Sequence, residues 1–124
     1  MKEKLQVVRD HLLGLHSILL ADQRAEYEQM YGRVKTSGEM LNLVMTHEWF
    51  AWLRALSSLI VEMDELMAAK EWSDATAKTL LDYTAALMVP ATEGAMFRQK
   101  YYAAVQRSPE VLIAHGQLKK LLPD

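Results

Sequence analysis

The chain has 124 residues, of which 51% are apolar and 24% are charged, as in soluble globular proteins rather than disordered or fibrous ones. Its net charge of −2, from 14 basic and 16 acidic side chains, is too small and too evenly spread to indicate binding to nucleic acid. The lack of cysteine excludes disulfides, thiolate metal sites and cysteine nucleophiles.

The length predicts one domain, residues 1–124. Near the N-terminus, Arg9 and Asp10 interrupt the sequence before an apolar run reaches the length of a signal peptide. No uncharged apolar stretch has the roughly 18 residues of a membrane span. We therefore expect a cytoplasmic protein with no membrane partner.

The first predicted element is a long amphipathic helix over about residues 3–31. Its apolar residues recur at intervals of three and four, as in Leu5, Val8, Leu12, Leu15 and Leu19. A turn is predicted at about 32–37, where the pattern Thr36-x-x-Glu39 forms a capping box at the start of a short helix near 38–46.

The second long helix is predicted over about 48–70. On a wheel of 100° per residue, Trp49 and Trp52 belong to its main apolar face, whereas Phe50 and Val61 lie outside that face beside Arg54. Two interpretations remain open: the helix is covered on two sides by its neighbours, or its second face meets another copy of the protein or a ligand. A covered Arg54 would need a carboxylate partner, with these candidates: Glu28, Asp64 or Glu65.

Caps and prolines mark the remaining helices. Ser73 predicts the start of a third helix, which Pro90 ends or kinks. Residues 92–107 repeat the apolar pattern, and Ser108 with Pro109 predicts a last helix over about 109–121. The sequence therefore predicts an all-α fold, an antiparallel up-and-down four-helix bundle with one or two short extra helices.

Motifs for metal and nucleotide chemistry are missing. Bundles that hold two irons use Glu-x-x-His pairs, and this chain contains none. His11 and His16 are separated by about 140° on the helix and cannot face one ion together. The sequence has no Gly-rich phosphate loop and no nucleophile elbow. We expect no metal and no other cofactor.

The basic and aromatic segment "FRQKYYAAVQR", residues 97–107, could stack on bases or contact phosphates. Because the chain is slightly acidic and Tyr101 falls on the apolar face, core aromatics beside solvated cations are the preferred interpretation.

Three segments resemble a family of small all-helical bacterial proteins whose domain has no assigned function: "WFAWLRALSSLIVEMDE" (49–65), "YEQMYGRV" (27–34) and "FRQKYYAAVQRSPEV" (97–111). In that family a proline often stands where Ala55 is here, and another where Glu48 is. The likeness spans most of the chain. It implies a bacterial source and a helical fold, and it implies no catalytic residue or ligand.

Two functions are compatible with these patterns. The leading hypothesis is a non-enzymatic bundle that acts through protein contacts as a homodimer, with Phe50, Arg54 and Val61 at the interface. The alternative is a small-molecule or catalytic pocket between helices, in which His16 and Glu26, two polar residues on the apolar arc of the first helix, would join Tyr27 and Arg54. The same polar residues could instead be paired inside the bundle.

Overall fold

The computed structural model describes residues 1–90 and 95–123, and this part of the chain is helical, without strands. The elements in chain order are α1 (Lys2–Tyr31), α2 (Ser37–Thr46), the 3₁₀ helix η1 (Glu48–Leu53), α3 (Arg54–Ala68), α4 (Asp74–Leu87), α5 (Met96–Arg107) and α6 (Pro109–Lys119). The predicted all-α class is confirmed. None of the described helices is long and apolar enough to cross a membrane.

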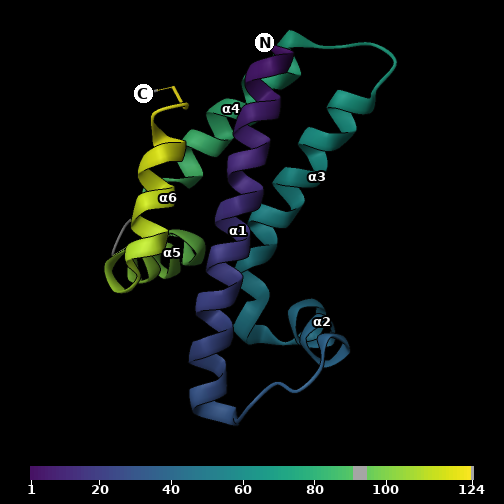
Figure 1. Ribbon diagram of the computed structural model, residues 1–124. Coiled ribbons are helices and arrows are strands. Elements are labelled where there is room, and N and C mark those ends of the chain that lie inside the picture. Colours follow the sequence, from purple (N-terminus) through teal and green to yellow (C-terminus); the bar gives the residue numbers. More distant parts are fainter. Residues whose placement is uncertain (91–94, 124) are drawn as a thin grey trace.

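The long helix α1 lies at the centre of the molecule (Figure 1). It packs against α3 on one side and against α6 on the other, and α4 also contacts it. The leucines and the valine of its predicted stripe are all buried: Leu5, Val8, Leu12, Leu15 and Leu19. Burying each such side chain contributes about 1.5–3 kcal/mol, so this stripe is a large share of the driving force for folding.

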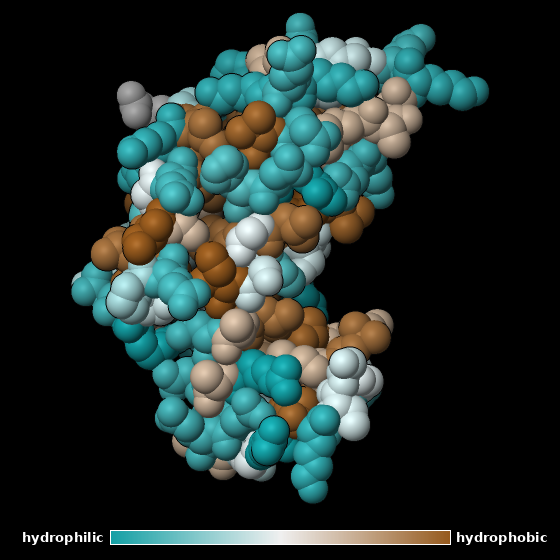
Figure 2. Space-filling view, viewed as in Figure 1, coloured by the Kyte–Doolittle hydropathy of each residue, from teal (hydrophilic) through white to brown (hydrophobic). Residues whose placement is uncertain are grey.

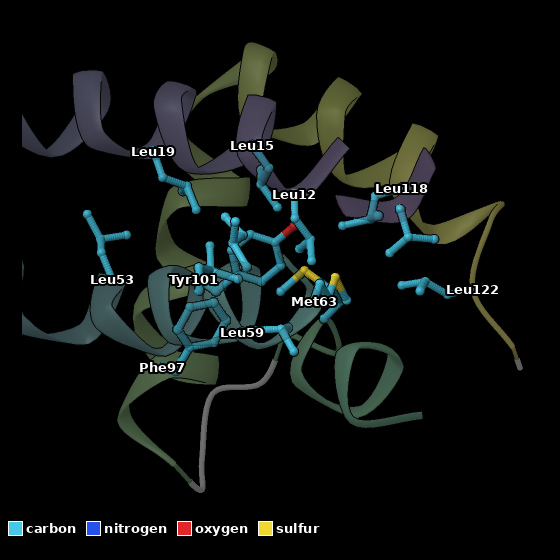
Figure 3. Close-up of a cluster of buried hydrophobic side chains, with 14 of the residues drawn as sticks. Leu12, Leu15, Leu19, Leu53, Leu59, Met63, Phe97, Tyr101, Leu118 and Leu122 are labelled. Atoms are coloured by element: carbon cyan, nitrogen blue, oxygen red, sulfur yellow. The ribbon is translucent and has the colours of Figure 1, made fainter. Parts of the chain in front are cut away.

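An aromatic residue from α5, Tyr101, fills part of the core between the helices. Figure 3 shows the ring of Tyr101 among leucines of α1 and beside Leu59 and Met63 of α3. Tyr101 is fully buried, and its hydroxyl lies 2.7 Å from Nδ1 of His115 on α6. Burial raises the pKa of this phenol, which therefore stays protonated and bonded to the imidazole.

Two polar contacts set the register of α1 against α3. Arg9 Nε and Nη2 donate to the two carboxylate oxygens of Asp64, at 2.9 and 3.1 Å. Further along the contact between α1 and α3, His16 Nε2 lies 3.0 Å from Ser57 Oγ. From the first pair to the second, the residue number rises by seven on α1 and falls by seven on α3. The two helices are therefore antiparallel and stay in register over about two turns.

The predicted caps are largely confirmed. The hydroxyls of Thr36, Ser73 and Ser108 accept backbone N–H bonds at the starts of α2, α4 and α6, and Pro109 opens α6. In the predicted capping box, the Glu39 carboxylate accepts from the backbone N–H of Lys35 at 3.3 Å rather than from that of Thr36.

The helix predicted over 48–70 is wrong in its first part, because residues 48–53 form η1 and α3 begins only at Arg54. A 3₁₀ helix advances 120° per residue instead of 100°, so the wheel misplaces the residues of this turn. The C-terminal ends of α3 and α6 are Ala68 and Lys119, slightly before the predicted ends at about 70 and 121. The helix predicted over 92–107 is described from Met96, and residues 92–94 lie outside the described part.

Replacing Leu12 by alanine should lower the free energy of unfolding by about 2–5 kcal/mol, because the side chain is fully buried between α1 and its neighbours. The matched control is Leu13→Ala, since the adjacent Leu13 side chain is 45% exposed. It should cost less than about 1 kcal/mol. Urea denaturation followed by circular dichroism measures both, and equal losses would contradict the described packing.

Candidate functional site

The short helix α2 is incompletely covered. None of its ten residues is buried, and it packs mainly on η1 through the half-buried Met40, Leu43 and Val44. Leu41 and Met45, on the adjoining side of α2, are 61% and 65% exposed. The apolar surface of α2 is therefore wider than the surface that the rest of the described chain covers.

Arg54 ties the end of α2 to the start of α3. Its Nη2 donates to the carbonyl oxygen of Met45 at 2.7 Å. Carbonyls in the last turn of a helix have no intrahelical partner, and a cation there also complements the helix dipole. Arg54 is exposed, so the condition under which it would need a carboxylate partner is not met, and two of the candidates bond elsewhere: Asp64 to Arg9 and Glu28 to the backbone N–H of Val34.

A hollow lies next to this tie. Figure 2 shows that the surface is indented between α2 and the upper half of α3. Arg54, Ser58, Val61 and Glu65 follow one another along this outer face of α3 at helical spacing, and all four are exposed. Around the edge of α3, Ala55, Ser58 and Leu59 line a groove of about 590 Å³ against α4. Small side chains on α3 leave this groove open.

The interface candidates divide into surface and core. Val61 is 53% exposed and lies two turns from Arg54 on the same face of α3. Phe50, in contrast, is fully buried, with its ring centroid 5.6 Å from that of Tyr27. The assignment of Phe50 to an exposed second face was an artefact of the 3₁₀ turn, and Phe50 is a core residue.

The four pocket candidates do not meet in one cavity. His16 bonds to Ser57, Glu26 forms an ion pair with Arg107 at 3.0 Å, and the ring of Tyr27 packs on an aromatic cluster at the end of α1. His16 and Glu26 are ten residues apart on α1, hence about 15 Å along its axis. Arg54 lies beside α2. The structure therefore does not bring these four residues together in one pocket.

The aromatic cluster around Tyr27 was not predicted. It consists of rings from α1, from the residue that precedes η1 and from η1 itself: Tyr27, Tyr31, His47, Trp49 and Phe50. Gln23 bonds to two tryptophans at the base of this cluster. Its backbone carbonyl accepts from Trp49 Nε1 at 3.1 Å, and its side-chain oxygen accepts from Trp52 Nε1 at 3.3 Å. The available signal was Gln23 itself, a polar residue that continues the apolar stripe one turn after Leu19.

Comparison of the chain with protein-family models, with curated proteins and with solved structures finds no match. In residues 1–90 and 95–123, no group of three or more His, Asp or Glu side chains is arranged to hold a metal ion. The function therefore has to be inferred from the surfaces and cavities themselves.

The half-buried His16 should make stability depend on pH. Burial lowers its pKa below the unfolded value of about 6.5, so the unfolded chain binds more protons between the two values. The free energy of unfolding should fall as the pH drops below about 6.5 and stop falling below the folded pKa. Burial, and then Lys119, lowers the pKa of His115 in the same direction.

Urea denaturation at a series of pH values between about 7 and 5 tests this, since it spans the unfolded histidine pKa. His16→Gln should reduce the pH dependence, and the part that remains should come from His115. The control Ser57→Ala loses the hydrogen bond but keeps the imidazole buried, so it should destabilise the protein while retaining the dependence. If His16→Gln leaves the profile unchanged, the titration does not come from His16.

Proposed function

We propose that this protein is a non-enzymatic helical scaffold that acts through protein contacts, and that its first partner is a second copy of itself. The observation that carries the proposal is the helix α2, which buries none of its residues and exposes Leu41 and Met45. Exposed apolar side chains gathered on one projecting element are typical of interaction surfaces rather than of solvated ones.

A second copy suits this surface because each chain carries both a projecting apolar helix and a hollow that could receive such a helix. The projecting α2 and the hollow beside the outer face of α3 lie next to each other (Figure 2), and the hydrogen bond from Arg54 to Met45 joins the two helices. In a twofold dimer the same patch serves both subunits, so each α2 can occupy the hollow of the other. Val61 and the groove against α4 supply apolar surface there, and the flexible Met45 can adapt to it.

The contacts of the polar side chains first considered for a pocket support a structural rather than a catalytic role. His16 is bonded to Ser57, Arg54 to a backbone carbonyl and Glu26 to Arg107. Each of these three groups therefore has a partner within the fold, and Arg54 and Glu26 line separate cavities rather than one shared site. A scaffold function requires no more than this.

The scaffold in this proposal is an antiparallel up-and-down four-helix bundle with one or two short extra helices. The resemblance of residues 27–34, 49–65 and 97–111 to a bacterial family supports a bacterial protein, and the charge balance supports a cytoplasmic one. These two statements belong to the proposal and are independent of the dimer.

Placing charges on α2 tests the dimer. The double variant Leu41→Glu with Met45→Lys should be a folded monomer, because both side chains are exposed and their replacement removes no core contact. The matched control places the same charges on Leu112 and Ile113 of α6, which are also exposed, and should sediment like the unaltered protein.

Analytical ultracentrifugation up to about 100 µM measures the masses, a range that detects even weak dimers. Val61→Asp, on the outer face of α3, should weaken the dimer as well. An unaltered protein that sediments as a monomer over the whole range would refute the proposal. So would an α2 variant that remains dimeric.

A further inference from the structure

A second cavity lies beside the aromatic cluster, between the end of α1, η1 and α5. It has a volume of about 570 Å³, within the roughly 300–1,000 Å³ of small-molecule sites. Four aromatic side chains line it, with one acidic and one basic side chain: Tyr31, His47, Trp49, Trp52, Glu48 and Lys100. The groove of the proposed dimer interface, between α3 and α4, shares none of these residues.

The aromatic wall of this cavity is held in place before any ligand arrives. Both indole N–H groups are bonded to Gln23, whose side chain is only 8% exposed. Trp49 is half-buried and Trp52 is only 6% exposed, so most of the aromatic surface open to a ligand belongs to Trp49, and neither indole offers a free donor. Fixing the wall in the folded protein removes an ordering cost from binding, which favours a planar ligand that stacks on it.

His47 adds a polar group with a defined tautomer. Its Nδ1 accepts the backbone N–H of Trp49 at 3.0 Å, so the proton of the neutral ring is on Nε2. Nε2 is then a hydrogen-bond donor. The ring itself packs edge-on against Tyr27, with centroids 5.4 Å apart, and this contact fixes its orientation.

The cavity carries one free charge of each sign. Glu48 on η1 and Lys100 on α5 are exposed, and within the described part of the chain neither side chain has a hydrogen-bond or ion-pair partner. They also form no ion pair with each other. Arg107, two turns along α5 from Lys100, is in contrast paired with both Asp22 and Glu26. The cations of α5 near the cavity therefore differ, and only Lys100 is available to a ligand.

We propose that this cavity binds a free aromatic α-amino acid. The ring of such a ligand lies against the indole of Trp49, with the small exposed part of Trp52 beside it, its carboxylate meets Lys100 and its ammonium meets Glu48. A ligand with one charge would leave the opposite charge of the cavity unmatched, and a neutral aromatic would leave both unmatched. A zwitterion with a flat side chain packs on the aromatic wall and pairs with both Lys100 and Glu48.

Nuclear magnetic resonance can test this site, because the chain has three tryptophans and therefore three indole N–H signals. Unlabelled L-tryptophan is titrated into ¹⁵N-labelled protein. The signals of Trp49 and Trp52 should shift and saturate. Trp72 bonds to Asp74 at the start of α4 and is the internal control, so its signal should stay in place.

Two analogues and three variants separate the charges from the wall. 3-Indolepropionate lacks the ammonium and tryptamine lacks the carboxylate, so each should bind about three- to tenfold more weakly than L-tryptophan. Lys100→Met should weaken L-tryptophan and 3-indolepropionate by a similar factor but not tryptamine. Glu48→Gln should weaken L-tryptophan and tryptamine but not 3-indolepropionate. Lys4→Met, on an exposed residue near the start of α1, should change nothing.

Three results would overturn the proposal. The first is the absence of a saturable shift of Trp49 and Trp52 at millimolar L-tryptophan. The second is a shift of all three indole signals together, which would indicate unspecific contact. The third is equal affinity for L-tryptophan and both analogues, which would show that the charges of the cavity take no part. All variants are on exposed side chains, so unchanged circular dichroism spectra should confirm that they fold.

Discussion

The length of α1 is the constraint from which the rest of the structure follows. Its 30 residues extend about 45 Å, whereas the 15 residues of α3 extend only about 22 Å and the 11 of α6 still less. An amphipathic helix is stable chiefly through burial of its apolar stripe, so the half of α1 that ends at Tyr31 needs other cover. The aromatic rings of η1 and the preceding segment provide it, and the cavity beside Trp49 and Trp52 arises where that cover meets α5.

Arginine side chains hold the shorter segments to this framework. Arg54 donates to the Met45 carbonyl in the last turn of α2, Arg24 to the Val34 carbonyl in the segment after α1, and Arg98 to the Val89 carbonyl after α4, at 2.7 to 3.0 Å. The Met45 carbonyl lies in the last turn of α2, where it has no intrahelical partner, whereas the Val34 and Val89 carbonyls lie in the segments that follow α1 and α4. Because the guanidinium is planar and permanently charged, these ties persist over the whole working range of pH.

Helical periodicity and caps were readable from the sequence because they are local. The stripe of α1, the hydroxyl caps at Thr36, Ser73 and Ser108, and the all-α class all depend on neighbours within one or two turns. The burial of Phe50 was not readable, since a switch to 3₁₀ geometry leaves no periodic signal over six residues. The cavity could not be predicted either, because Trp49 and Lys100 are brought together only by the tertiary packing of η1 and α5.

The weak attachment of α2 has a consequence for motion. Opening a segment costs free energy in proportion to the apolar surface it exposes, and α2 has no fully buried residue to expose. Its amide protons should therefore exchange with solvent through local opening, long before those of α1 exchange through unfolding of the whole chain. A subunit that covers α2 would order it at the same time, so that association and the completion of folding become one event.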